Sequence, residues 1–296
     1  MVVAANPRNR KSRAAWSRMS WRVRAVREGL AGTRLSVSMS YNIPYDNHHM
    51  EGEMDITLWQ FRYSPYNEKA RWALDFKRLP HRRVDLMPGP HAGRVRKLSG
   101  QTSTPVVTID GRPVAGSAAI LAELDRLAPE PPLATADAEV RDIERRFDDD
   151  WGPRIRRKVL ALLLEDYGYF TRVFAEGQSL AQRMIYRAVL PLAAGMVRRG
   201  NGIVGPESIA DGQAALEEAL DFVAERSRAT GYLVGEGFTA ADLTAASMLA
   251  MAVDPPDSTM ARPQPMAKSF GAWVASSQAH PGAAWVRAIY ARHRAG

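Results

Sequence analysis

A cluster of prolines at residues 129–132 (PEPP) divides the sequence after Met54 into two parts with different hydrophobic patterns. Before the cluster, short apolar runs typical of strands alternate with helical patterns, whereas after it apolar residues recur only at helical spacing. Because proline can continue neither a helix nor the inside of a sheet, the cluster predicts a linker. The sequence therefore predicts a small α/β domain over residues 54–128 and an all-α domain over residues 136–296.

The first part predicts a strand, helix, strand unit with a right-handed parallel crossover, followed by a hairpin and a second helix. Ser64 and Pro65 mark the start of the first helix, since serine is a good N-cap and proline fits the first helical position. Asp110-Gly111 is typical of the turn in a tight antiparallel hairpin. The expected elements cover residues 56–61, 65–77, 83–86, 106–109, 112–115 and 117–127.

The second part begins with one long helical stripe, which Gly152-Pro153 should bend. Its members recur at steps of three and four: Val140, Ile143, Phe147, Trp151, Ile155, Val159 and Leu162. Further helical patterns begin near residues 180, 207, 240, 265 and 283. We therefore expect five or six helices and no further strand in this part.

Residues 1–53 carry much of the positive charge of the chain. They hold nine basic and four acidic residues, a net charge of +5 out of +8, and they show no sustained apolar period. This composition is typical of a leader or a disordered extension, and an RNA-binding or targeting arm is the alternative interpretation. Because Met54 directly precedes the first predicted strand, we expect the folded part to begin there. The remaining chain lacks the basic stripe that binding to nucleic acid requires.

The absence of cysteine excludes disulfides, thiolate metal sites and any mechanism that uses a thiol of the protein. Histidines outside the first segment do not have the spacing of metal ligands, so we expect no metal. No apolar run is long enough to span a bilayer, so we expect no membrane partner.

Residues 63–74 (YSPYNEKARWAL) resemble the active-site motif of the glutathione transferase superfamily. Redox relatives have two cysteines where this chain has Ser64 and Asn67, and Ser-type transferases have Ser-Pro at this place. The resemblance implies that the Ser64 hydroxyl donates a hydrogen bond to the thiolate of bound glutathione. Ser64 as an N-cap alone is the other interpretation. Tyr63 and Tyr66 are alternative donors, because other branches of the superfamily use a tyrosine near this strand end.

Two further motifs resemble glutathione-binding segments of the same superfamily. Residues 100–107 (GQTSTPVV) resemble the segment with a cis proline, which implies a cis Thr104-Pro105 bond and a free backbone edge at Thr104. Residues 115–120 (AGSAAI) resemble the segment in which a serine at a helix N-terminus binds the γ-glutamyl carboxylate. This chain keeps Ser117, but Gly116 replaces the usual acidic residue. An ordinary strand-starting proline and a helix cap are the alternatives for Pro105 and Ser117.

A fourth motif, Thr239-Ala240-Ala241-Asp242, is a capping box that also occurs in the helical domain of the superfamily. We interpret it as part of the folding architecture. The resemblance covers residues 54–290 and implies a thioredoxin-like domain followed by a helical domain.

The resemblance implies a cytoplasmic, homodimeric detoxification enzyme that conjugates glutathione, its co-substrate, to a small apolar electrophile. The implied catalytic residue is Ser64, and the implied glutathione-binding residues are Thr104, Pro105, Gly116 and Ser117. Four residues are expected to form the acceptor site: Tyr66, Trp151, Arg154 and Tyr167. A place in the core is the alternative for Trp151. The rival interpretations are a non-catalytic binding protein and a regulatory module that docks a macromolecular partner.

Overall fold

The computed structural model describes residues 19–27, 33–41, 54–260 and 262–294. The chain divides into two compact units, residues 1–53 and 54–296. Each unit is described by itself.

The first unit contains a two-stranded antiparallel ladder, in which β1 (Met19–Arg27) pairs with β2 (Thr33–Tyr41). We expected a leader or a disordered extension without strands here, whereas the described residues form this ladder. The physical reason is that Trp21, Val23 and Ala25 alternate with Arg22 and Arg24, a period of two that a search for helical spacing overlooks. The leader interpretation concerns residues 1–18, 28–32 and 42–53 as well, which lie outside the described residues.

The second unit begins with a four-stranded mixed sheet of order β4-β3-β5-β6. β3 runs parallel to β4 and antiparallel to β5, and β5 pairs antiparallel with β6. The bounds are β3 (Ile56–Gln60), β4 (Arg82–Asp85), β5 (Val106–Ile109) and β6 (Arg112–Ala115). Asp110 and Gly111 both have positive φ, at 48° and 78°, which is the conformation of the predicted tight hairpin turn. The α/β fold class predicted for this part is confirmed.

Helices cover both faces of this sheet. Ile56, Leu58 and Val107 belong to the large core that also contains the apolar residues of α1 (Pro65–Phe76) and α3 (Ser117–Leu127). On the other face, Val106 packs with Val95 of α2 (His91–Ser99) in a smaller cluster. We did not predict α2, because its sequence is largely basic and Val95 is its one buried residue.

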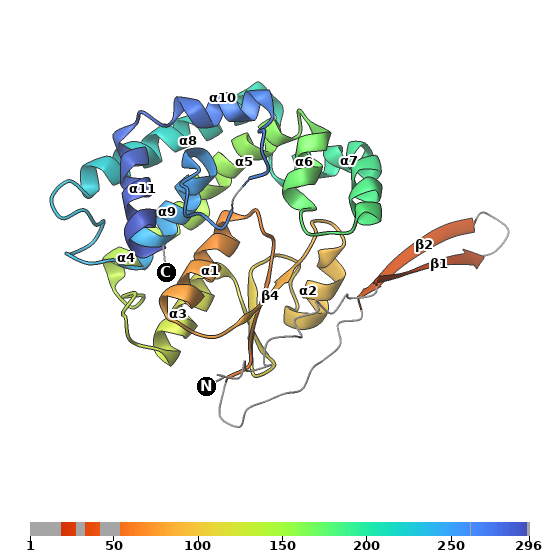
Figure 1. The fold of residues 1–296 in the computed structure, drawn as a ribbon, viewed down its shortest axis with the longest axis horizontal. Coiled ribbons are helices and arrows are strands. Elements are labelled where there is room, and N and C mark those ends of the chain that lie inside the picture. The colour runs from red at the N-terminus through yellow and green to blue at the C-terminus, as the bar shows by residue number, and fades with distance from the viewer. Residues whose placement is uncertain (1–18, 28–32, 42–53, 261, 295–296) are drawn as a thin grey trace, which may run out of the picture. The chain divides into compact units, whose positions relative to one another are not determined.

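The chain after the proline cluster is helical throughout the residues that the structure describes, as predicted (Figure 1). The long stripe forms two helices joined by a π-helical turn, η1, and it continues through Gly152-Pro153. The count of five or six helices was too low, because α6 was missed and the stripe divides. The bounds are α4 (Ala138–Arg145), η1 (Arg146–Trp151), α5 (Gly152–Leu163), α6 (Tyr167–Phe174), α7 (Leu180–Gly200), α8 (Gly205–Arg226), α9 (Ala240–Val253), α10 (Lys268–Ser276) and α11 (Pro281–His293).

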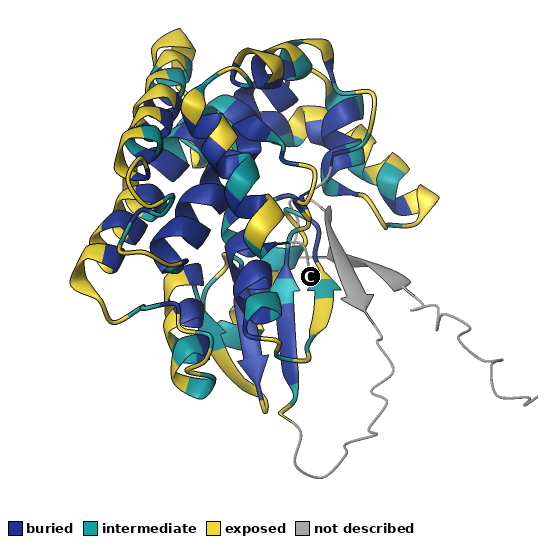
Figure 2. Cartoon of the chain, turned by 60° about the vertical axis from the view of Figure 1, so that its left-hand side comes forward, coloured by how far each residue is buried: buried dark blue, intermediate teal, exposed yellow. Residues whose placement is uncertain are grey.

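Helix α9 forms the centre of the helical part, and every one of its residues is buried. It packs against α1, α4, α5 and α11, so the buried residues of the two domains form one continuous core (Figure 2). The predicted capping box is present at its start: the Asp242 carboxylate accepts hydrogen bonds from the Thr239 amide and hydroxyl, each at 2.9 Å. Within the described ranges, no helix is both long and apolar enough to cross a membrane.

Removal of residues 1–53 is expected to leave the melting temperature of the rest of the chain unchanged, because residues 54–296 form a compact unit with their own core. Thermal unfolding of the shortened chain, followed by circular dichroism, checks this. A second shortened chain that also lacks β3 is the control and should not fold. A fall of several degrees in the first chain would show that residues 1–53 contribute to the stability of the second unit.

Candidate active site

A cavity of about 590 Å³ lies between the two domains. The α/β domain provides the segment that leads into α1, the start of α2 and the loop before β5, and α5, α6 and α7 provide the opposite wall. Figure 1 shows α6 and α7 on the same side of this unit as α2. The α/β side includes Tyr63, Ser64, Tyr66, His91, Thr102 and Thr104. The helical side includes Arg156, Val159, Phe170, Tyr186, Val189 and Met196.

Ser64 lies at the N-terminus of α1 and on the cavity wall. Its backbone is extended, with φ −162°, and Pro65 occupies the first turn, as the sequence predicts for an N-cap residue. The Ser64 hydroxyl nevertheless caps no amide of α1, and it forms no hydrogen bond with any residue that the structure describes. It therefore remains free to donate to an anion held at the positive end of the helix dipole.

Thr104 lies beside Ser64 on the same wall and is tied to α1. The Asn67 Nδ2 donates a hydrogen bond to the Thr104 Oγ1 at 3.1 Å, which joins the first two sequence motifs. The Thr104-Pro105 bond is cis, as predicted. The Gly116 amide donates to the Pro105 carbonyl at 3.1 Å, so the third motif adjoins this loop. Pro105, Gly116 and Ser117 are not among the residues that line the cavity.

Gly116 has φ +91°, a backbone conformation that residues with a side chain rarely adopt. It ends β6, and the buried Ser117 then begins α3. The backbone therefore accounts for glycine at the position where relatives have an acidic residue.

The two tyrosines that could replace Ser64 as donor differ, because only the Tyr66 hydroxyl already donates to a protein partner. The Tyr66 hydroxyl donates to the Asp148 carbonyl at 2.8 Å, and the Tyr63 hydroxyl accepts from the Arg262 Nε at 3.2 Å. Burial raises the pKa of Tyr66 to about 12 and raises the pKa of Tyr63 as well, so both phenols stay protonated near neutral pH. Gly152 leaves room at the π-helical turn: a Cβ there would clash with the Phe147 carbonyl and would also lie 3.2 Å from the Tyr66 oxygen.

Three residues predicted for the acceptor site do not line this cavity. Trp151 is buried in the core and donates to Glu218 at 3.1 Å, and Arg154 forms an ion pair with Asp211 at 2.7 Å. Tyr167 packs partly buried against the core at the start of α6. Of the four residues only Tyr66 lies in the lining of this cavity, and Trp151 has the core position that was its alternative interpretation.

The helical wall of the cavity consists instead of Arg156, Val159 and Leu160 from α5 and several residues of α6 and α7. Residues two positions apart on a helix point about 200° apart, so Arg154 and Arg156 face nearly opposite sides of α5. Spacing alone did not reveal which side faces the cavity. The sequence likewise gave no sign that His91 lines the cavity. In the structure its ring packs edge to face on Phe61.

Sequence comparison identifies both domains. Residues 58–132 match the family of glutathione S-transferase N-terminal domains, and residues 206–276 match the family of glutathione S-transferase C-terminal domains. The chain belongs to the glutathione S-transferase superfamily. No curated protein matches it.

Solved structures share the glutathione S-transferase fold with this chain. The β-etherase LigF from Sphingobium sp. strain SYK-6 is 20% identical, with a TM-score of 0.56 over 80% of this chain and 95% of its own. A glutathione S-transferase from Rhodospirillum rubrum F11 is 22% identical, with a TM-score of 0.51 over 80% and 88%. A glutathione S-transferase from Methylobacillus flagellatus, solved with glutathione bound, is 20% identical, with a TM-score of 0.50 over 79% and 94%.

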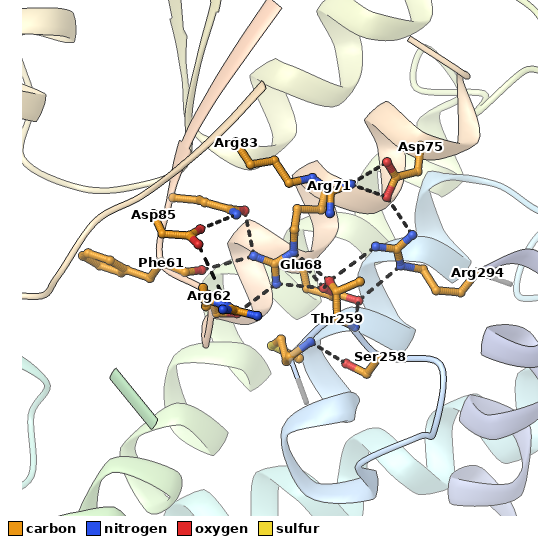
Figure 3. Close-up of polar contacts among 12 residues, drawn as sticks. Phe61, Arg62, Glu68, Arg71, Asp75, Arg83, Asp85, Ser258, Thr259 and Arg294 are labelled. Carbon is orange, nitrogen blue, oxygen red and sulfur yellow. Dashed lines mark hydrogen bonds and ion pairs between the residues drawn. The ribbon is translucent and has the colours of Figure 1, made fainter. Parts of the chain in front are cut away.

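In this glutathione S-transferase fold, a buried ion cluster holds the segment that carries Ser64 (Figure 3). The Arg71 guanidinium donates to the carbonyls of Phe61 and Arg62, at 3.2 Å and 3.0 Å, and Phe61 itself lines the cavity. The Glu68 carboxylate accepts from Arg71 at 2.8 Å, and its other oxygen lies 3.4 Å from the Arg294 Nε. These side chains are almost fully buried. The cluster therefore couples α1 to the last helix of the chain.

The Glu68 carboxyl stays ionised inside this cluster. Burial alone would raise its pKa, but the positive charges of Arg71 and Arg294 and hydrogen bonds from Thr259 and Arg71 outweigh burial and lower it. A neighbouring cluster has the same character: Lys69 is fully buried and lies 2.6 Å from Asp148 and 2.8 Å from Glu144. Helix α1 thus presents consecutive charged residues to the helical domain, each with partners of opposite charge.

Proposed function

We propose that this glutathione S-transferase superfamily member binds glutathione with its sulfur in the cavity and conjugates it to a small apolar electrophile. The observation that supports this most is the Ser64 hydroxyl, which lies at the N-terminus of α1, lines a cavity between the domains and has no partner among the described residues. A thiolate placed there would gain both a hydrogen bond and the favourable field of the helix. Such a site promotes attack by sulfur without any thiol of the protein.

In the proposed reaction the glutathione thiol first loses its proton to solvent. The thiolate then attacks an electrophilic carbon, a carbon–sulfur bond forms, and the leaving group departs with its electron pair. The Ser64 hydroxyl donates to sulfur throughout and forms no covalent bond. The mainly apolar wall of α5, α6 and α7 accommodates the electrophile.

Glutathione would bind along the segment from Thr104 to Ser117. The Thr104 backbone would pair with the cysteinyl part, and Ser117 at the start of α3 would bind the γ-glutamyl carboxylate, with Pro105 and Gly116 shaping the loop between them. The solved structure from Methylobacillus flagellatus has glutathione bound in the same fold, which supports the choice of ligand. We further propose a homodimer in the cytoplasm.

A non-catalytic binding protein is the second candidate, and Gly116 favours it. The acidic side chain expected there would face the α-amino group of glutathione, and a glycine provides no such group. Binding and turnover must therefore be measured separately.

Calorimetric titration with glutathione is expected to show one site per chain with a Kd between about 1 µM and 1 mM, the usual range for enzyme substrates. Cysteinylglycine, which lacks the γ-glutamyl group, is the matched control and should bind at least ten-fold more weakly. Turnover with chlorodinitrobenzene then separates the two candidates. Binding without turnover supports the binding protein, and absence of any glutathione binding would refute the proposed function in both forms.

A further inference from the structure

The cavity has an unusual distribution of charge. Among its lining residues, which all belong to the described part of the chain, none is acidic and Arg156 carries the one permanent charge. His91 is the other titratable base in the lining, and burial lowers its pKa, so it is mostly neutral at pH 7. The cavity is therefore positive at one point of an otherwise mainly apolar surface.

The Arg156 guanidinium forms no ion pair with any residue that the structure describes. Its Nε atom is buried without a hydrogen-bond partner, and the guanidinium lies 5.7 Å from the centre of the Tyr66 ring. Its neighbours on α5 differ: Arg154 and Arg157 both pair with Asp211, at 2.7 Å and 2.9 Å. The nearby acid Asp148 is paired with Lys69.

A cation next to an apolar cavity without a counter-ion costs free energy unless a ligand supplies the opposite charge. Guanidinium is suited to this role, because its planar donors match the two oxygens of a carboxylate or two oxygens of a sulfonate. The rest of the wall, with Val159, Phe170, Val189 and Met196, suits an aromatic or alkyl body.

We propose that Arg156 determines acceptor specificity, and that the acceptor is an apolar electrophile with a carboxylate or sulfonate group that Arg156 binds. This assignment of substrate class rests on the proposed function. The anion site itself does not, because it can be occupied without glutathione.

Two fluorescent probes test the site directly. Anilinonaphthalene sulfonate and N-phenylnaphthylamine have the same aromatic body, and only the first carries an anionic group. The wild-type chain without glutathione should bind the sulfonate more tightly than the neutral probe. Arg156→Met should weaken sulfonate binding by about ten-fold to a hundred-fold, as expected for the loss of a charged hydrogen bond, with little change for the neutral probe. Arg156→Lys should restore most of the sulfonate affinity.

Arg157→Met is the matched control, because it removes a positive charge from the same helix at a residue that pairs with Asp211 and does not line the cavity. It should leave the ratio of the two affinities unchanged. An equal loss for both probes in Arg156→Met, or no preference for the sulfonate in the wild type, would overturn the proposal. A loss of glutathione affinity in Arg156→Met with unchanged probe binding would also overturn it, since the cation would then serve glutathione. If the probes behave as expected but calorimetry finds no glutathione binding, the anion site stands and the proposed conjugation falls.

Discussion

Replacement of Glu68 by glutamine should lower the free energy of unfolding by about 3 to 5 kcal/mol, the cost of breaking a buried ion pair from one side. The substitution keeps the size of the side chain and removes its charge. Arg71 is then left without a carboxylate partner, and its side chain is only 2% exposed. Arg294 keeps Asp75 at 2.8 Å, so the main cost falls on Arg71. Urea unfolding followed by circular dichroism measures the change.

Glu123→Gln is a matched control, because Glu123 and Arg126 have the same i, i+3 spacing as Glu68 and Arg71. The Arg126 side chain, however, is 63% exposed. Solvent screens this pair, so its loss should leave stability almost unchanged. Equal effects of the two substitutions would contradict the prediction. Because Arg71 also holds the carbonyls of Phe61 and Arg62, Glu68→Gln should reduce activity before the chain unfolds.

The same cluster should make the free energy of unfolding depend on pH in the acidic range. The pKa of Glu68 is lower in the folded chain than its usual value, so its contribution is fully present above the pKa of the unfolded chain, about 4.3. As the pH falls from there toward the lowered folded value, the unfolded state binds the proton first and the contribution is lost. The free energy of unfolding can be measured at several pH values between about 6 and 3. As the pH is lowered over this range, it should fall less steeply in Glu68→Gln than in the wild type. Parallel curves would contradict the assignment.

Replacement of Ser64 by alanine should lower turnover with a generic electrophile by ten-fold or more, with glutathione affinity nearly unchanged. A thiol with a pKa of about 8.5 is only a few per cent ionised at neutral pH, and a shift of about two units corresponds to about 2.7 kcal/mol. One hydrogen bond to a charged group contributes about 1.5 to 3 kcal/mol, so Ser64 together with the end of α1 can provide most of this shift. The pH profile of kcat should move to higher pH in the variant.

Tyr66→Phe and Tyr63→Phe test the alternative donors. The Tyr66 hydroxyl already donates to the Asp148 carbonyl, so Tyr66→Phe should change the thiol pKa less than Ser64→Ala does. The Tyr63 hydroxyl accepts from Arg262 and keeps its own proton, so Tyr63→Phe is the stricter test of the two. Ser99→Ala serves as a control, since its hydroxyl bonds to the Val95 carbonyl outside the cavity. Full activity of Ser64→Ala with loss in a tyrosine variant would assign the donor role to that tyrosine.

The local elements of the α/β domain could be predicted because their signals are local. The hairpin at Asp110-Gly111 and the start of α1 at Pro65 depend on residues that are close in sequence, and so does the capping box at Thr239 in the helical domain. Helix α2 was missed because Val95 is its one buried residue, and α6 was missed because it is only eight residues long. The π-helical turn was missed because the apolar stripe runs through it without a break, so the pattern gives no sign of the change in helix type.

The candidate site was predicted on one side only. Ser64 and Thr104 were found from motifs that fix backbone geometry, and both line the cavity. The helical side requires the rotation of α5 about its axis, which depends on how α8 and α9 pack against it. The Glu68 cluster could not be predicted either. In the sequence alone, the charged residues of this helix indicate a solvent-exposed face, and only the structure places Arg294 beside them.

The separation of Glu68 and Arg294 has a consequence for biosynthesis. The two residues are 226 positions apart, so at about 5 to 20 residues per second a ribosome needs about 10 to 45 s between them. During that time the nascent α1 holds its carboxylate without one of its two arginine partners, and the later helices that bury it are not yet complete. Helix α1 should therefore reach its final packing only when synthesis is nearly finished, and chaperones that shield α1 until then should raise the yield of folded protein.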